Sequence, residues 1–550
     1  MFKKGFTLVE LLAVIVILAV IALIATPIVK DSIANSKEQA LKETINSIER
    51  AAYNYGYQND IGYDTNYKKL TLDELISKGF LKGDIINPVT NEKMNGCVLY
   101  RWNETNNQYE FKYNEECPKY PESLITVLLE QYSESNTTGL VKDSTNPNLY
   151  YYTGTKEEVS NNFLWYGGHQ WRVLEFDTNA NTITLITQQP LTSIQPASST
   201  WTTQSAYESS YINSWLNDYF YNSLDSSIQN NILDNTFNVG IYDNVSEITT
   251  TQKVGLLDQK QYERAGERSS FLAIKNGFWL GNRYGLGDVV IVDSNDRLFF
   301  DSASAAFGVR PVIKISDITI TGGDGTLTNS YQAGNKATNT NNVQVGEYIN
   351  VPYSGSDNAC GNDNMCTFRV VSKDSDSIKV VLNGLLPTKS KWADSARDNI
   401  TINDLIYTNV LNPFIANIDS KYIATGTYGV GMYELANSYT VPQSTTITAN
   451  IGLPTVGEMF SGNDIDLSTS STKTFVDVNT IENPTVSSYY WTMNRYSSYY
   501  VRHVKYNGYL GTGSPSNTYG VRAVIYLKSG TSAITFTKGE GTAQSPYTLQ

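Results

Sequence analysis

A long apolar run near the N-terminus is the first pattern along the chain. No charged residue lies between Leu11 and Val29, and a stretch of about 20 apolar residues is long enough to cross a bilayer as a helix. Lys3 and Lys4 precede the run, so the positive-inside tendency predicts a cytoplasmic N-terminus and an extracellular region after Lys30. The pattern therefore predicts one membrane-spanning segment, with most of the chain outside the cell.

The apolar positions after this run follow the repeat of an amphipathic helix. They recur at steps of three, four or eight residues, at Ile33, Leu41, Ile45, Ile48 and Ala52. We predict a single helix from residue 6 to about residue 54, within a membrane-spanning and amphipathic segment 6–60, with a bend at Pro27. At about 1.5 Å per residue this helix is roughly 70 Å long, enough to cross a membrane and support a domain outside it.

A small globular unit is predicted over residues 61–120. A short capped helix over residues 71–76 is followed by strands at Cys97–Trp102 and Gln108–Tyr113, with a polar turn between them. Cys117 lies just after the second strand. A disulfide between Cys97 and Cys117 would therefore staple this sheet.

The rest of the chain contains one pattern twice, over residues 138–331 and 340–550. In each copy a Trp-x-x-Asn-Arg motif precedes a Gly-Val-Arg motif by 29 residues. The motif residues are Trp279, Asn282, Arg283 and Arg310 in the first copy and Trp491, Asn494, Arg495 and Arg522 in the second. Because a repeat of about 200 residues is too long for a solenoid unit, we predict two tandem α+β domains, over residues 121–337 and 338–550.

Other landmarks align earlier in the two copies. The apolar strand that contains Arg172 corresponds to the strand that contains Arg369, and Gly240 corresponds to Gly431. A helix is predicted from Ile212 to Leu224, with Trp215 packed in the core.

The repeated arginine and tryptophan residues have two interpretations. Arg310 and Arg522 lie within apolar strands, where a buried arginine bonded to a carboxylate or a carbonyl stabilises the fold. The alternative is that they contact a ligand. Trp279 and Trp491 are likewise expected to be core anchors.

An aromatic cluster surrounds the second tryptophan, where the run Tyr489-Tyr490-Trp491 is followed by Tyr496, Tyr499 and Tyr500. Exposed tyrosine and tryptophan side chains make good contact surfaces for carbohydrate or protein. The alternative is a strand surface that is merely rich in tyrosine.

Charge and composition limit the function. Charged residues make up 17% of the chain and the net charge is −13, whereas binding to a phosphate backbone needs concentrated lysine and arginine, so we expect no nucleic-acid partner for the domains. The only histidines, His169 and His503, do not occupy matching positions in the two copies. Their scarcity argues against a histidine-based triad or a multi-histidine metal site. We expect no catalytic activity and no cofactor.

The four cysteines fall into two local pairs, Cys97 with Cys117 and Cys360 with Cys366. An even number in an exported chain predicts two disulfides, with free thiols or zinc as the alternatives. Asp324 and Glu540 lie in glycine-rich turns, which suit either an ion or simply a tight turn.

The N-terminus resembles the type IV prepilin family, whose signal is a glycine followed by Phe-Thr-Leu-Val-Glu and a long apolar helix. The match here runs from Gly5 through Phe6 to Glu10. The resemblance implies cleavage after Gly5 by a prepilin peptidase, methylation of the new amino group on Phe6, and Glu10 placed against the N-terminus of a neighbouring subunit. The alternative is a plain membrane anchor that happens to begin this way.

The two repeats resemble bacterial surface modules with a C-type-lectin-like fold, related in shape to formylglycine-generating enzymes. The resemblance rests on the order of the Trp, Asn-Arg and Gly-Val-Arg motifs, and it implies a fold rather than a ligand. The calcium-binding motifs of C-type lectins are absent from the sequence.

Together these patterns predict a type IV pilin-like surface protein that displays two extracellular binding modules for carbohydrate or protein, in partnership with the membrane and other pilin subunits. The alternatives are a pseudopilin of a secretion or DNA-uptake system and an anchored cell-surface enzyme.

Overall fold

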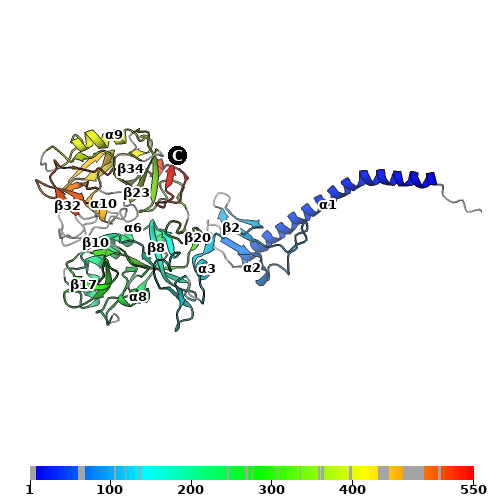
Figure 1. Cartoon of the computed structure of the whole chain (residues 1–550), viewed down its shortest axis with the longest axis horizontal. Helices are drawn as coiled ribbons and strands as arrows, with labels where there is room; N and C mark the ends of the chain where they lie inside the picture. The colour runs from blue at the N-terminus through cyan, green and yellow to red at the C-terminus, as the bar shows by residue number, and fades with distance from the viewer. Residues whose placement is uncertain are drawn as a thin grey trace, which may run out of the picture. The chain divides into compact units, whose positions relative to one another are not determined.

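The structure, a computed structural model, has a mixed α+β architecture (Figure 1). The residues that it describes are 8–59, 68–103, 107–117, 119–134, 138–197, 199–244, 247–266, 270–274, 277–305, 307–334, 336–356, 359–360, 364–394, 399–431, 445–461, 488–505 and 510–550. The chain divides into two compact units, Met1–Glu122 and Ser123–Gln550. The predicted division of the second unit at residue 337 stays a prediction.

The first unit begins with one long helix, α1 (Leu8–Asn59), which Figure 1 shows as a continuous ribbon. The helix continues through Pro27 and ends five residues beyond the predicted end. Side-chain positions for residues 21–32 lie outside the described part of the structure.

Among the residues that the structure describes, no helix combines the length and the apolar character needed to cross a membrane. The membrane-spanning segment therefore stays a prediction from the sequence.

A three-stranded antiparallel sheet completes the first unit, in the order β1 (Lys68–Thr71), β2 (Cys97–Asn103), β3 (Gln108–Asn114). Between β1 and β2 lies α2 (Leu72–Ser77), which starts with a capping box because the Thr71 hydroxyl accepts from the Glu74 amide and the Glu74 carboxylate accepts from the Thr71 amide. The predicted short helix and both predicted strands are confirmed within one or two residues.

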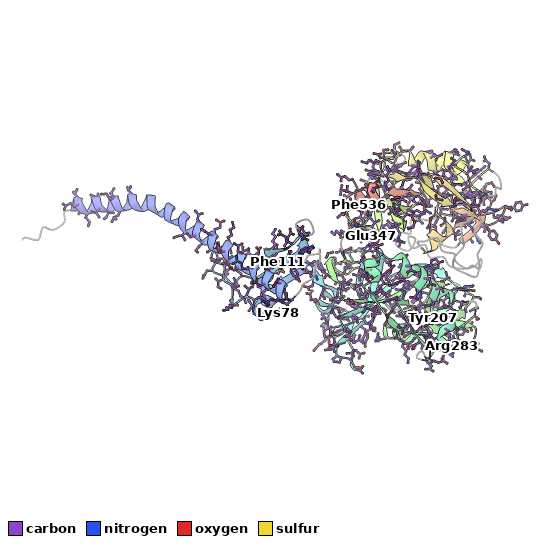
Figure 2. The ribbon with its side chains drawn as sticks, turned by 180° about the vertical axis from the view of Figure 1, so that it is seen from behind. Lys78, Phe111, Tyr207, Arg283, Glu347 and Phe536 are labelled. Atoms are coloured by element: carbon purple, nitrogen blue, oxygen red, sulfur yellow. A yellow bond between two sulfur atoms is a disulfide. The ribbon has the colours of Figure 1, made fainter. Side chains whose placement is uncertain are left out.

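The core of this unit forms where the amphipathic half of α1 meets the sheet. Ile48 and Ala52 are buried against Leu75 and Val98, with Ile45 partly buried beside them, which confirms the predicted apolar face of the helix. Ile33 is exposed. The ring of Phe111 on β3 packs edge-to-face against Tyr53 of α1, at 5.7 Å between ring centroids (Figure 2).

The first half of the second unit is built on one large sheet in the order β11-β19-β9-β8-β7-β21-β20, with β14 paired to β19 and with β5 and β6 beside β8. Its strands are β5 (Leu140–Lys142), β6 (Leu149–Tyr152), β7 (Phe163–Tyr166), β8 (His169–Asp177), β9 (Thr182–Thr187), β11 (Ile232–Leu233), β14 (Val254–Gly255), β19 (Val312–Ser316), β20 (Thr319–Gly322) and β21 (Tyr331–Ala333). A short strand, β4 (Glu122–Ser123), stands at the start of the unit.

The second half repeats most of this sheet, in the order β26-β34-β24-β23-β22-β36-β35 with β29 paired to β34, but among the described residues it has no counterpart of β5 and β6. The strands are β22 (Tyr348–Pro352), β23 (Met365–Lys373), β24 (Ser377–Leu382), β26 (Ile423–Ala424), β29 (Ile451–Gly452), β34 (Val524–Lys528), β35 (Phe536–Lys538) and β36 (Tyr547–Leu549). Even a β-bulge recurs, after Val173 in β8 and after Val370 in β23. The repeat in the sequence is therefore also a repeat of topology.

A second sheet and a hairpin recur in the same way. The meander β15 (Phe278–Arg283), β16 (Asp288–Val292), β17 (Leu298–Ser302) corresponds to β30 (Tyr490–Arg495), β31 (Val501–Val504), β32 (Leu510–Gly513). The pair β10 (Thr192–Ile194) and β18 (Phe307–Val309) corresponds to β25 (Ser390–Lys391) and β33 (Thr518–Tyr519). The hairpin β12 (Asn235–Asn238) and β13 (Thr249–Gln252) corresponds to β27 (Gly426–Gly429) and β28 (Thr446–Ala449).

Short helices connect these strands. They are α3 (Leu124–Leu129), α4 (Gln204–Glu208), α5 (Tyr211–Ser214), η1 (Trp215–Phe220), α6 (Tyr221–Ser223), α7 (Ser226–Gln229) and α8 (Gln259–Arg264) in the first half, and η3 (Tyr407–Leu411), α9 (Asn412–Ile415), α10 (Val456–Ser461) and η4 (Gly530–Ser532) in the second. The helix predicted from Ile212 to Leu224 contains a π-helical turn at η1, and Trp215 is buried as predicted.

Candidate functional site

The two repeated tryptophans make the same contact in both halves. The indole Nε1 of Trp279 donates to the Ile194 carbonyl at 2.8 Å, and that of Trp491 donates to the Ser390 carbonyl at 2.9 Å. Both side chains are fully buried. Each tryptophan therefore ties its meander to the neighbouring short strand, β10 or β25, as a core anchor.

The repeated asparagines hold a helix in place. Asn282 Oδ1 accepts from the Gln259 amide at 2.7 Å, at the start of α8, and Asn494 Oδ1 accepts from the Val456 amide at 2.9 Å, at the start of α10. The Nδ2 group of Asn282 donates to Gly240, and that of Asn494 donates to the corresponding Gly431. These buried amides satisfy backbone groups that would otherwise lack partners.

Arg310 and Arg522 are buried and bonded to carbonyl groups. Their Nε atoms donate to the carbonyls of Thr187 and Leu382, at 2.9 and 2.7 Å, which lie at equivalent strand ends. Burial lowers the pKa of Arg310 to about 9, so the guanidinium stays charged at neutral pH. The arrangement favours the structural interpretation of both residues over ligand contact.

The remaining residues predicted from the sequence lie in several different places. Arg283 forms an ion pair with Glu247 at 2.9 Å, and Arg495 ends the corresponding strand β30. Cys97 is joined to Cys117 and Cys360 to Cys366 by disulfides. Gly5 and Phe6 lie outside the described residues, and Glu10 is on the exposed surface of the first turns of α1.

The two candidate ion sites look like turns. The Asp324 carboxylate accepts from the amide and the hydroxyl of Thr326, and Glu540 pairs with Lys336. Within the described residues there is no group of three or more His, Cys, Asp or Glu side chains placed to hold a metal ion.

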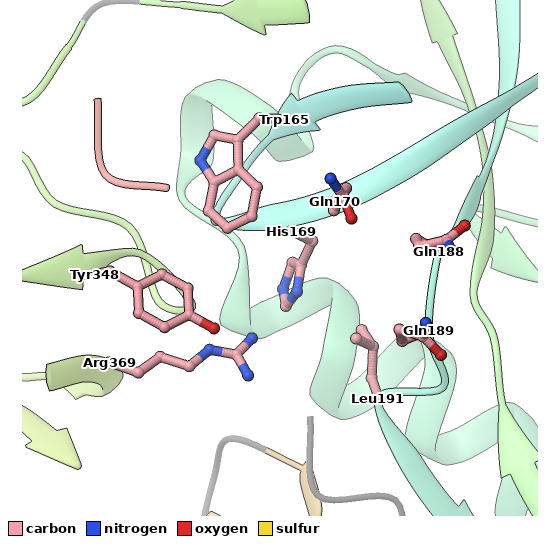
Figure 3. A pocket seen from close by; sticks show the side chains of 9 residues that line it. Trp165, His169, Gln170, Gln188, Gln189, Leu191, Tyr348 and Arg369 are labelled. Atoms are coloured by element: carbon pink, nitrogen blue, oxygen red, sulfur yellow. The ribbon is translucent and has the colours of Figure 1, made fainter. Parts of the chain in front are cut away.

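A pocket lies where the two halves of the second unit meet (Figure 3). The pocket is small, because the space in it that water can occupy amounts to about 20 Å³, room for about one water molecule. Its lining residues are Trp165, Gly168, His169, Gln170, Gln188, Gln189, Leu191, Tyr348 and Arg369. We call it the junction pocket.

The junction pocket is assembled from strand ends. Trp165 is the last residue but one of β7, and His169 begins β8. The tight turn between the two strands is made by Gly167 and Gly168, both at positive φ. Across the pocket, Tyr348 on β22 and Arg369 on β23 are cross-strand partners in the second half. Figure 3 shows the Arg369 guanidinium and the His169 ring on facing sides of the hollow.

The polar groups of the junction pocket are unusual because several are buried without a partner. Within the described part of the chain, Trp165 Nε1, His169 Nδ1, Gln170 Oε1 and Gln189 Oε1 have no hydrogen-bond partner. Burial, followed by the charge of Arg369, lowers the pKa of His169 to about 3. The imidazole is therefore neutral at physiological pH.

A second hollow adjoins the junction pocket and shares Trp165 and Gln170 with it. The space in it that water can occupy amounts to about 60 Å³. Its other lining residues carry mainly hydroxyl and amide groups, and they are Thr328, Asn329, Ser330, Gln332, Glu540, Thr542, Gln544 and Ser545.

Exposed aromatic side chains occur at equivalent places on both meanders. Tyr284 and Tyr496 each follow the repeated Asn-Arg pair directly, and both are exposed. In the first half Tyr284 stacks on Phe300 at 3.9 Å between ring centroids, next to the exposed Phe299. In the second half the predicted aromatic cluster is exposed only in part, because Tyr496, Tyr499 and Tyr500 are exposed whereas Tyr490 and Trp491 are fully buried.

Comparison with known proteins identifies two segments. Residues 1–26 match the prokaryotic N-terminal methylation motif, and residues 181–317 match a domain of unknown function (DUF6273). The N-terminus is that of a type IV pilin-like precursor. The motif implies processing by a prepilin peptidase and assembly with other pilins. No curated protein and no solved structure matches the chain.

The match over residues 181–317 covers β9 to β19, within the first copy of the repeat. Its description assigns no function. The resemblance of the repeats to C-type-lectin-like modules stays a prediction.

The sequence did not point to the junction pocket, because its residues come from positions about 200 residues apart that share no motif. The repeat allows one comparison, between Arg369 and the residue aligned with it. Arg172 and Arg369 align, yet Arg172 is bonded in its own core to Asn162 and to the Phe271 carbonyl, whereas Arg369 reaches the pocket. The two aligned arginines therefore have different environments in the two copies.

Proposed function

We propose that this chain is a structural and adhesive subunit of a type IV pilus-like surface filament, and that the unit Ser123–Gln550 is its binding head. The observation that carries the proposal is the methylation motif over residues 1–26, at the start of the long helix α1. In this proposal the chain is held in the membrane by its N-terminal segment until assembly, with the C-terminal region extracellular.

Glu10 has a specific role in the proposed assembly. A carboxylate within an apolar helix is costly unless a cation neutralises it. Cleavage after Gly5 would create an ammonium group on Phe6, and the ammonium of one subunit would then neutralise Glu10 of its neighbour. Glu10 lies on the exposed surface of α1.

The head is proposed to bind rather than to catalyse. The exposed aromatic clusters around Tyr284 and Tyr496 support this, because flat, rigid aromatic side chains provide contact area for carbohydrate or protein at a low entropy cost. The lectin-like fold that the repeats resemble is part of the same proposal, and so is the absence of a cofactor.

Immunogold labelling of native cells tests the proposal, with variant Glu10→Ala and control Glu38→Ala, whose side chain is also exposed on α1 but lies beyond the apolar run. We expect label on thin filaments for the native chain and for Glu38→Ala, and label restricted to the membrane for Glu10→Ala. Filaments labelled normally in Glu10→Ala would refute the role of Glu10. Label confined to the membrane in the native strain, with DNA uptake lost on deletion, would favour a pseudopilin instead.

A further inference from the structure

We propose that strand β17 (Leu298–Ser302) pairs antiparallel with β17 of a second copy of this chain, so that two heads are joined edge to edge about a two-fold axis. This contact goes beyond adhesion to another surface, because the partner is the same chain. The inference rests on the proposed function only for its setting between filament subunits. The pairing itself can be measured on the chain in solution.

Strand β17 is an edge strand. It pairs with β16 and with no other strand in the described part of the chain, and Figure 1 shows it at the rim of the first half. The Ala303 amide, directly after β17, donates to the Gly287 carbonyl beside β16 at 2.9 Å. The backbone groups of the odd-numbered residues therefore face β16, and those of Leu298 and Phe300 point outward, because the two orientations alternate along an antiparallel strand.

The outward backbone groups of Leu298 and Phe300 form an open edge. The next outward residue, Ser302, is bonded within the chain, because its amide donates to the Asp301 carboxylate and its carbonyl accepts from the Ala305 amide. No residue that the structure describes bonds to the N–H and C=O groups of Leu298 and Phe300. Such an edge is a template on which a further strand can pair.

Apolar side chains are exposed beside this open edge. Phe299 is 54% exposed, and its ring lies 5.1 Å from that of Phe300, which in turn stacks on Tyr284. Leu286 is exposed as well. Edge strands in stable monomers are commonly protected by charged side chains or proline, whereas contiguous exposed apolar surface marks an interaction site. The side chains around β17 therefore favour an edge that a partner covers.

The charges on β17 favour a second copy as that partner. Arg297, Phe299 and Asp301 alternate along the strand and lie on one face of it. When two such strands run antiparallel with Phe299 opposite Phe299, each Arg297 faces Asp301 of the other copy. Opposite charges directly across a strand pair stabilise it, and like charges destabilise it. Arg297 also pairs with Asp293 of its own chain but stays largely exposed, and its guanidinium has donors for both carboxylates.

The same register satisfies the open edge. It places Leu298 of each copy opposite Phe300 of the other, so that the two residues exchange N–H···O=C bonds in both directions. All the outward groups that lack a partner in the single chain are then paired. One alignment thus matches the backbone, the aromatic side chains and the charges together.

The repeat provides an internal comparison. The motifs on both sides of β17 and of β32 are equally spaced in the two copies, so Phe299-Phe300-Asp301 corresponds to Gly511-Thr512-Gly513. An edge strand at this place therefore forms without aromatic or charged side chains. The fold does not require those of β17, which leaves a partner as the reason for them.

Cysteine cross-linking of the full chain in detergent tests the register. The two Cα atoms of a pair without mutual hydrogen bonds lie about 4.5 Å apart, which a disulfide can span. We expect Phe299→Cys to give a covalent dimer on mild oxidation, seen on a non-reducing gel and reversed by reductant. Asp301→Cys should give at least tenfold less, because this position faces Arg297 of the second copy. Tyr499→Cys, which replaces an exposed aromatic residue of the second half, is the matched control.

Charge reversal tests the partner and guards against a folding artefact. Sedimentation velocity at micromolar concentrations should show a monomer–dimer equilibrium for the native chain. Arg297→Glu and Asp301→Arg each place like charges opposite one another, so each should weaken dimerisation at least tenfold. An equimolar mixture of the two variants should restore dimers, because every reversed charge then meets an opposite one. Mixing would not rescue a misfolded variant.

Several results would overturn the inference. They are a native chain that stays monomeric, equal cross-linking of Phe299→Cys and Tyr499→Cys, dimers that survive both charge reversals, and a mixture that does not recover. Paired heads in a chain that labels no filaments would overturn the proposed function and leave this inference standing. Labelled filaments from a chain whose heads do not pair would do the reverse.

Discussion

Gly168 and Gly346 meet back to back at the junction between the two halves of the second unit. A Cβ on Gly346 would collide with the Gly168 carbonyl, and a Cβ on Gly168 would collide with the carbonyl of Val345. Both glycines also have positive φ. The close approach brings the turn before His169 against the start of the second half, which is what closes the junction pocket.

The close contact between the two glycines predicts that one added methyl group at Gly168 destabilises the fold. Gly168→Ala should lower the free energy of unfolding by about 2–4 kcal/mol, because it adds overpacking to the strain of a left-handed backbone. Denaturant unfolding of the full chain in detergent measures it, and Gly285→Ala is the control because its Cβ would meet no atom within 4 Å. Equal stability of the two variants would show that the halves do not pack as described.

A buried ion pair in the second half has no equivalent in the first. Lys379 on β24 pairs with Glu458 on α10, and both are almost fully buried, whereas the strand register places Thr184 at the position equivalent to Lys379. Lys379→Met should destabilise the fold by about 3–5 kcal/mol because it leaves a buried carboxylate.

The double variant Lys379→Met with Glu458→Leu should recover most of that loss, because two apolar side chains of similar size replace the pair. A double-mutant cycle by chemical denaturation checks this. Additive losses would mean that the two side chains do not interact.

Stability should depend on pH through Glu347. This carboxyl group accepts from the Gln344 amide at 2.7 Å, and burial raises its pKa from 4.5 to about 8. The folded state therefore holds the proton more tightly than the unfolded state does. The resulting stabilisation is complete below pH 4.5 and is lost as the pH rises towards 8.

The free energy of unfolding should consequently fall by a few kcal/mol between pH 5 and pH 8.5, taking about 1.4 kcal/mol per unit of pKa shift. Glu347→Gln retains the shape and cannot ionise, so its stability should change less over this range. Parallel pH profiles for the two proteins would contradict the account of Glu347.

The repeated asparagines give a paired prediction. Asn282→Ala and Asn494→Ala should each cost about 1–3 kcal/mol, because each leaves the first amide of α8 or α10 buried without its acceptor. Asn295→Ala is the control, since this side chain is exposed. The melting temperatures of the three variants test this prediction. A lowered melting temperature for only one of the two asparagine variants would mean that the two asparagines are not equivalent.

Local signals in the sequence predicted much of the fold. The capping box at Thr71, the alternating strands of the small sheet and the apolar face around Ile48 each depend on neighbours in the chain, so the pattern alone predicts them. The equal spacing of Trp279 and Arg310 with Trp491 and Arg522 predicted two copies of one fold, and the strand orders agree with it.

The junction pocket could not be predicted in this way. Trp165 and Arg369 are brought together by packing between two halves of the unit, and the repeated strand that contains Arg369 gives no sign of this contact. The π-helical turn at Trp215 was also missed, because a single extra residue in a helix leaves the apolar pattern almost unchanged.

The most direct test of the central claim is the mass of the N-terminal peptide of the chain, recovered from filaments sheared from native cells. The account predicts a peptide that begins at Phe6 and carries one N-methyl group, in the sheared fraction. A chain that keeps Met1 to Gly5, or one that is absent from the sheared filaments and remains in the membrane, would contradict it.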